Sequence, residues 1–194
     1  GALTPEETGE ALHTVIDECD YLLRMIEDLN DVGKAQVGGK VEVVKEALDL
    51  GRLITAVADR LKGRAREIGM RIEVAERSPL PSIQADPEKL RRVLENLVAN
   101  AIKYGKPPAD TGRAPVVTIV SLVEAPGPGR DYETVRVEVH DNGMGIPLAE
   151  ADRVFEPYYQ AEAGRRRKAG VGLGLAFCRM VVDAHGGAIW TQPG

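Results

Sequence analysis

The chain has 194 residues, of which 43% are hydrophobic and 28% charged, and its formal net charge is −5. This acidic balance argues against a general nucleic-acid-binding protein, which is usually basic. No apolar run approaches the ~18 residues of a transmembrane helix, and the N-terminus lacks the basic stretch and apolar core of a signal peptide. We therefore expect a cytoplasmic segment that makes no membrane contact, so that any membrane anchor would lie outside it.

The first expected element is one long helix over residues 4–33. Thr4 can cap this helix, Pro5 suits its first position, and Gly33 is suited to end it. Apolar side chains recur at alternating spacings of three and four residues, at Leu12, Val15, Cys19, Leu22, Ile26 and Leu29. Such a seam favours a helix that packs against helices not all present in the sequence; the alternative is a helix packed on its own domain. We assign residues 1–40 to this arm and its polar linker.

The compact domain is expected over residues 41–194. Its expected elements are a helix over Leu48–Ile68, a strand over Met70–Ala75, a helix from the cap Asp86 to Tyr104, strands over Val116–Val123 and Thr134–His140, a helix over Leu173–His185, and the start of a strand at Ala188–Thr191. This alternation indicates an α/β fold: a two-layer sandwich, with a mixed sheet covered on one side by helices, and an N-terminal helical arm. The isolated Cys19 and Cys178 are expected to be free thiols, buried or half-buried.

A first motif lies at the end of the helix that Asp86 caps. Asn96, Asn100 and Lys103 are spaced i, i+4 and i+7, so they share one helical face. A carboxamide oxygen suits Mg²⁺, and a nearby ammonium suits phosphate. The alternative is an ordinary solvated face, which this motif alone does not exclude.

A second motif, Asp141–Ile146, directly follows an alternating strand. A carboxylate at a strand end only accepts hydrogen bonds, so it can select a ligand with an N–H donor such as the adenine amine. Gly143 and Gly145 allow close approach because they have no Cβ. Alone, the segment is equally compatible with an ordinary Asp-Asn-Gly turn.

A third motif places Gly170, Gly172 and Gly174 at the start of a helix. Amides at a helix N-terminus favour phosphate. A dinucleotide-binding motif of the Rossmann type would require a strand before Gly170, whereas residues 164–169 are polar and basic.

In this order, the three motifs resemble the nucleotide-binding boxes of the GHKL superfamily, and of sensor histidine kinases in particular. Asn96–Tyr104 is similar to the N box, Asp141–Ile146 to the G1 box, residues 155–158 to the F box and Gly170–Leu175 to the G2 box. The resemblance runs from about Val41 to Thr191. Residues 4–33 also resemble the second helix of the dimerisation and phosphoacceptor hairpin.

The resemblance implies a Bergerat ATP-binding fold with ATP and Mg²⁺ as cofactors. Asn100 would be the Mg²⁺ ligand, with Asn96 beside it at the phosphates, and Lys103 would reach a phosphate. Asp141 would bind the adenine amine, and Phe155 would anchor the start of the ATP lid. The other implied nucleotide-binding residues are Tyr104, Gly143, Gly145, Ile146, Arg167, Lys168, Gly170, Gly172, Leu173, Gly174 and Leu175.

The lid would span residues 156–169 and carry the basic run 165–168, which would help to bind the triphosphate, dock an acidic partner, or simply be solvated. His140 and His185 are expected to be structural. His13 is not expected to be the phosphoacceptor, because the acidic residue and Thr-Pro that follow this histidine in the family are absent here.

The favoured function is ATP binding and transfer of the γ-phosphoryl group to a histidine on a helix outside this chain, since no H box is visible. We therefore assign no catalytic residue to the chain, and we expect a final strand beyond the Pro-Gly turn at residues 193–194. Expected partners are the phosphoacceptor helix of the same or a partner subunit, a response regulator, and a second copy of the parent protein. The alternatives are a degenerate nucleotide-binding regulatory module, an anti-sigma-type Ser/Thr kinase, and a GHKL ATPase.

Overall fold

The computed structural model describes residues 41–107, 112–127, 129–160 and 171–192, and in the arm residues 4, 8–9, 12, 15, 19, 23, 26–27 and 29–34. Within these ranges, the elements are β1 (Glu46–Leu48), α2 (Leu50–Glu67), β2 (Arg71–Glu76), β3 (Ile83–Ala85), α3 (Pro87–Tyr104), β4 (Val116–Glu124), β5 (Thr134–Asp141), the 3-10 turns η2 (Leu148–Glu150) and η3 (Arg153–Phe155), and α5 (Gly174–Ala184).

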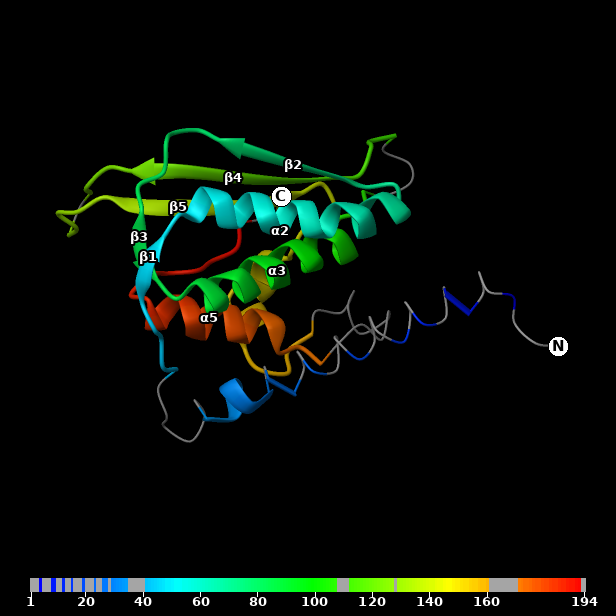
Figure 1. The fold of residues 1–194 in the computed structure, drawn as a ribbon, viewed down its shortest axis with the longest axis horizontal. Coiled ribbons are helices and arrows are strands. Elements are labelled where there is room, and N and C mark those ends of the chain that lie inside the picture. Colours follow the sequence, from blue (N-terminus) through cyan, green and yellow to red (C-terminus); the bar gives the residue numbers. More distant parts are fainter. Residues whose placement is uncertain are drawn as a thin grey trace.

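The three longer strands form one mixed sheet in the order β2-β4-β5. β2 runs parallel to β4, with Ile72 opposite Val117, and β4 runs antiparallel to β5, with Val117 opposite Asp141. Helices α2 and α3 cover one face of this sheet, and α5 packs on the side of α3 that faces away from α2 (Figure 1). The expected α/β sandwich is therefore confirmed.

The main core lies between the sheet and these two helices. Its fully buried side chains include Ile54 and Ala58 of α2, Val98 of α3, and Val117 and Ile119 of β4. Val93 of α3 forms a second cluster with Phe177, Cys178 and Val181 of α5. Helix α3 thus packs against two apolar clusters on different sides. The orientation of α3 is fixed by this packing, which leaves one strip of polar side chains on its surface.

The helix starts follow the capping residues. The Asp49 carboxylate accepts from the Arg52 N–H at 3.0 Å and caps α2, so this helix begins at Leu50 and the expected start at Leu48 is wrong. Leu48 instead ends β1, which pairs antiparallel with β3. These three-residue strands are too short to show an alternating pattern, which explains why they were not predicted.

Two other expectations need correction. Residues 188–191 are not a strand; Trp190 stacks on the Arg136 guanidinium at 5.2 Å and the Thr191 hydroxyl donates to Ala151 O at 3.3 Å, so side-chain contacts hold this segment in place of a ladder. Cys178 is a buried free thiol as expected, but Cys19 is exposed.

The described residues of the arm after Thr4 are helical up to Lys34, one residue beyond the expected end. Side chains of its apolar seam are exposed, among them Leu12, Val15, Ile26 and Leu29. Val32 is fully buried and packs against Leu173 and Ala176 near the start of α5. The last turns of the arm therefore contact the domain, while the seam remains open to solvent.

Candidate nucleotide-binding site

The N-terminal end of α3 is fixed by Asp86. This carboxylate caps the helix at the Lys89 N–H, 3.0 Å away, and accepts a second bond from the Val44 N–H, also at 3.0 Å. Burial acts to raise the pKa of Asp86, but the hydrogen bonds from these two N–H groups, together with the positive charge of Lys89, hold the pKa below the ordinary value. The His185 ring at the end of α5 accepts from the Asp86 N–H at 2.9 Å, so His185 has the expected structural role.

The polar strip on α3 is where the first motif lies. Asn96 and Asn100 are half-buried, and Lys103 is exposed at the end of the strip. A Cβ added to Gly174 would lie 3.5 Å from the Asn96 side-chain Cγ, so the start of α5 lies close to this carboxamide. The first and third motifs are therefore neighbours in the fold.

Lys103 has an electrostatic environment suited to an anion. Its ammonium lies 5.3 Å from the centroid of the Tyr104 ring. Desolvation lowers the pKa of Lys103, and the positive charge of Arg64 on α2 lowers it further. A phosphate bound here would relieve the repulsion between these two cations.

The second motif meets the C-terminal end of the same helix. Asp141 is the last residue of β5; its side chain is exposed, and its Oδ1 accepts from the Gly143 N–H at 2.9 Å. A Cβ on Gly143 would lie only 2.4 Å from Tyr104 O, so the loop is seated on the end of α3. Of the remaining predicted residues in this loop, Gly145 has φ +69° and Ile146 is half-buried.

Asn142 holds this loop in place, and the sequence motif had assigned it no role. Its Oδ1 accepts from the Val116 N–H at 3.1 Å, and its Nδ2 donates to Ala114 O at 2.8 Å. The loop after β5 is thereby tied to the start of β4. An Asn between Asp141 and Gly143 is the only local signal of this anchor, because asparagine readily bonds to backbone groups.

The two ends of the expected lid are joined to each other. The Tyr158 N–H donates to Gly172 O at 2.9 Å, and both residues have positive φ, 65° and 78°. A Cβ on Gly172 would lie 2.6 Å from Tyr159 O. This clasp requires a glycine at 172 and brings together segments separated by residues 161–170. Arg167, Lys168, Gly170 and the rest of that stretch lie outside the described residues.

Phe155 and Leu173 flank this clasp. The Phe155 ring is 4% exposed, with the Arg179 guanidinium of α5 4.6 Å from its centroid. Leu173 is also 4% exposed and packs in the cluster with Val32, and Leu175 is half-buried. The Leu173 side chain is therefore committed to packing, so any contact with a nucleotide would come from its backbone.

Together, these contacts place carboxamides, an ammonium, an exposed carboxylate and a helix N-terminus around the C-terminal half of α3. Gly143 and Gly172 let backbone segments approach one another closely, because a Cβ at either position would lie under 3.0 Å from other backbone atoms. Among the described residues, no group of three or more His, Cys, Asp or Glu is placed to hold a metal. Mg²⁺ would fit here with Asn100 and the phosphates of the nucleotide as ligands, because Mg²⁺ is commonly bound by few protein groups together with substrate phosphates.

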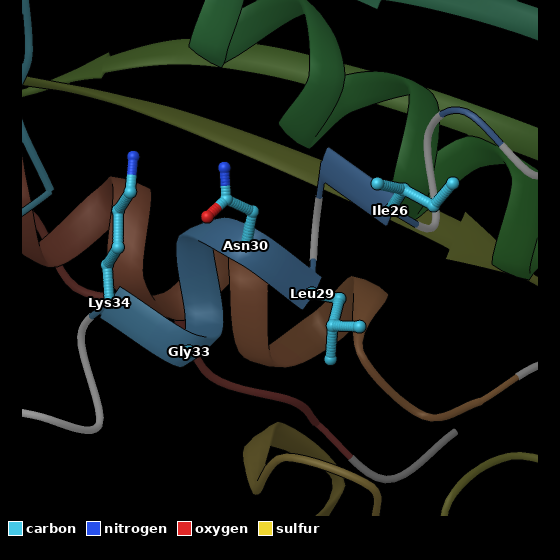
Figure 2. A pocket seen from close by; sticks show the side chains of 5 residues that line it. All are labelled: Ile26, Leu29, Asn30, Gly33 and Lys34. Carbon is cyan, nitrogen blue, oxygen red and sulfur yellow. The ribbon is translucent and has the colours of Figure 1, made fainter.

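His140 differs from the expectation. Its ring is exposed and lies 2.7 Å from a carboxylate oxygen of Glu138, so it belongs to a surface pair and not to packing. A separate groove lies on the arm, lined by Ile26, Leu29, Asn30, Gly33 and Lys34 (Figure 2). It contains none of the predicted nucleotide-binding residues. No helix in the described part of the chain has the length and apolar character to cross a membrane.

The chain is similar in sequence and fold to known sensor proteins and histidine kinases. The alginate biosynthesis sensor protein KinB of Pseudomonas aeruginosa is 33% identical over 98% of this chain, which spans 30% of KinB. Full-length ShkA, solved in complex with AMPPNP, is 30% identical with a TM-score of 0.71 over 100% of this chain and 38% of ShkA. Histidine kinase ThkA, solved in complex with the response regulator protein TrrA, is 24% identical and shares the fold, with a TM-score of 0.63 over 100% of this chain and 49% of that one.

The chain thus spans half or less of the length of these three proteins. The model of the family described as histidine kinase-, DNA gyrase B- and HSP90-like ATPase matches residues 85–194, a range that contains all three motifs. The chain belongs to this family of ATPases, and its relatives are sensor histidine kinases.

Proposed function

We propose that this chain is the ATP-binding catalytic region of a two-component sensor histidine kinase, and that it donates the γ-phosphoryl group of ATP to a histidine on a helix outside the chain. The observation that carries the proposal is the proximity of three separate segments at α3: Asn96 lies close to Gly174, and the loop after Asp141 is seated on Tyr104. ShkA, which shares the fold at 30% identity, was solved with AMPPNP, and this supports a nucleotide as the ligand.

In this proposal, the chain contributes positioning and charge. The Asp141 carboxylate would accept from the adenine amine, which fixes the base. Asn100 would hold Mg²⁺, which neutralises phosphate charge when bound, and Lys103 would bind a phosphate oxygen. Backbone N–H groups at the start of α5 would donate hydrogen bonds to other phosphate oxygens. Phosphoryl transfer depends mainly on such positioning and electrostatic stabilisation.

The exposed seam of the arm supports the rest of the proposal. Leu12, Val15 and Ile26 each expose more than half of their surface, which is unusual for apolar side chains spaced along one helical face. A phosphoacceptor helix of the same or a partner subunit would cover this seam, and a response regulator would receive the phosphoryl group. The resemblance of residues 4–33 to the family's hairpin supports both partners.

Calorimetric titration with ATP tests the adenine assignment. Asp141→Ala should weaken ATP binding by roughly ten- to hundredfold, because the base would lose a hydrogen bond to a charged acceptor. Asp131→Ala is the matched control, since Asp131 is an exposed residue in the loop at the opposite end of β5. An affinity of Asp141→Ala equal to that of the control would exclude this role.

The metal assignment is tested by titrating with and without Mg²⁺. Asn100→Ala should remove the gain in nucleotide affinity that Mg²⁺ gives to the parent, whereas the exposed carboxamide variant Gln84→Ala should retain it. A parent-like Mg²⁺ response in Asn100→Ala would argue against it as a ligand. With γ-labelled ATP, the chain alone should remain unlabelled, and a separately added phosphoacceptor hairpin should become labelled; label on His13 would contradict the proposal.

A further inference from the structure

Gly105 ends α3, and its backbone torsion angle does not require a glycine. Its N–H donates to Ala101 O at 2.7 Å, and its φ of −80° is open to any residue. It is nevertheless buried, at the point where α3 meets the end of β5. The reason for a glycine must therefore lie in what surrounds it.

A side chain at position 105 would collide with the proposed adenine-binding carboxylate. A Cβ built there would lie 2.6 Å from the Cβ and 3.1 Å from the Cγ of Asp141, as well as 2.3 Å from Ala101 O. Carbon atoms that are not bonded rest about 3.5–4.0 Å apart. Any residue larger than glycine would thus force Asp141 or the end of α3 to move.

The same contact is equally close from the side of the loop. A Cβ on Gly143 would lie 2.7 Å from the Cα of Gly105, so the two glycines pack backbone against backbone. The Gly143 N–H also binds Asp141 Oδ1 at 2.9 Å. The contact between Gly105 and Gly143, two residues without side chains, therefore sets the position of the Asp141 carboxylate.

The loop has little freedom to absorb an added methyl group. Asp141 pairs with Val117 in the sheet, and the next residue, Asn142, is bonded at both side-chain ends to the start of β4. The easiest response to a larger residue 105 is a shift of the Asp141 side chain, since this side chain is exposed.

We propose that Gly105 is a positioning residue for adenine recognition: it sets the distance between the Asp141 carboxylate and the helix that carries Asn100. This inference rests on the proposed function, in which adenine binds at Asp141 and the phosphates bind along α3. A nucleotide spans both, so an error in their separation would weaken recognition of the base while leaving the phosphate contacts intact.

The test compares ATP with purine riboside triphosphate, which lacks only the 6-amino group. For the parent, ATP should bind more tightly because a hydrogen bond to a charged group favours it by roughly ten- to hundredfold. Gly105→Ala should lose most of this preference, through weaker binding of ATP and nearly unchanged binding of the analogue. Gly63→Ala is the matched control, because an added Cβ there meets no atom within 4 Å.

The outcomes separate the two levels of inference. A parent that binds both nucleotides equally would overturn the adenine assignment and this proposal with it. A parent that prefers ATP, together with a Gly105→Ala variant that keeps the full preference, would overturn the role of Gly105 alone. Equal weakening of both nucleotides would also overturn it, since that result indicates a general structural defect.

Gly105→Ala could also unfold the domain, and a second variant addresses this outcome. In Gly105→Ala combined with Asp141→Gly, the side chain that the new methyl group would meet is gone. Recovery of a cooperative thermal transition, followed by circular dichroism, would confirm that the contact with Asp141 is what excludes a side chain at position 105. Failure to recover would assign the clash to Ala101 O and overturn the proposal.

Discussion

The bond between His185 and Asp86 should be worth about 2 kcal/mol of domain stability. His185 Nε2 accepts from the Asp86 N–H at 2.9 Å, and Nδ1 lies 2.7 Å from Val181 O. Because Nε2 accepts, the proton is on Nδ1, which donates to Val181 O. The ring thereby ties the end of α5 to the start of α3.

His185→Ala removes both hydrogen bonds and leaves the Asp86 N–H without this acceptor. Asp86 is only 7% exposed, so water does not readily replace it. An unsatisfied buried donor costs about 1–3 kcal/mol. His185 itself is half-buried, so we take the middle of that range. The variant should therefore unfold with a free energy about 2 kcal/mol lower than the parent.

Urea unfolding followed by circular dichroism gives this free energy. His140→Ala is the matched control, because the His140 ring is exposed and its pair with Glu138 is on the surface, where such pairs contribute about 0–1 kcal/mol. Nucleotide affinity measured on folded His185→Ala should be close to that of the parent, because Asn100 lies about 20 Å along α3 from Asp86 at 1.5 Å per residue. Equal losses of stability in the two histidine variants would refute this account.

Three further outcomes follow from the structure. Gly172→Ala should destabilise the junction between Tyr158 and Gly172 by at least about 1–2 kcal/mol, because the strain of positive φ adds to the collision with Tyr159 O. The expected lid should then be cleaved sooner in limited proteolysis. Arg92→Leu should speed hydrogen exchange in residues 26–34, because its guanidinium lies 3.2 Å from Asp31 and 4.2 Å from the Phe177 ring centroid; unchanged exchange would show that the pair does not anchor the arm. The pKa of Asp86 is lowered in the folded protein, so the charged carboxylate contributes to folding stability. This contribution is complete above the unfolded pKa of about 4 and is lost as pH falls through the folded pKa. Asp86→Asn should therefore flatten the pH dependence of the melting temperature below pH 4.

The parts of the fold that local signals specify were predictable. Asp86 followed by Pro87 marks the start of α3, and its apolar spacing carries the helix to Tyr104, as observed. The start of α2 was placed too early because Leu48 extends the apolar pattern of the helix, although its partner in β3 places it in a strand. Whether Leu48 belongs to a strand or to the helix is decided by its pairing with a distant segment. The apolar pattern within one segment carries no information about that pairing.

The site shows the same division. Asn96, Asn100 and Asp141 are predicted from the sequence as nucleotide-binding residues because their side chains carry chemistry that suits a nucleotide, and their role stays a prediction. The positive φ of Tyr158, the anchoring bonds of Asn142 and the close approach of Gly105 to Asp141 depend on contacts with residues remote in the sequence. The sequence predicts the start of a strand at residues 188–191, but Trp190 is held by Arg136 and not by a ladder.

Glycines and polar residues therefore do different work in this site. In the proposed site, the polar side chains would determine which ligand groups can be bound, whereas Gly105 and Gly143 determine how closely the end of α3 and the loop after β5 approach each other. A motif that lists only the polar residues would be satisfied by a chain with alanine at positions 105 and 143, yet in that chain the Asp141 side chain or the end of α3 would have to move. Conservative replacement of the polar residues should consequently weaken individual contacts, whereas replacement of these glycines should change the distances between them, and the ratio of base recognition to phosphate binding distinguishes the two effects.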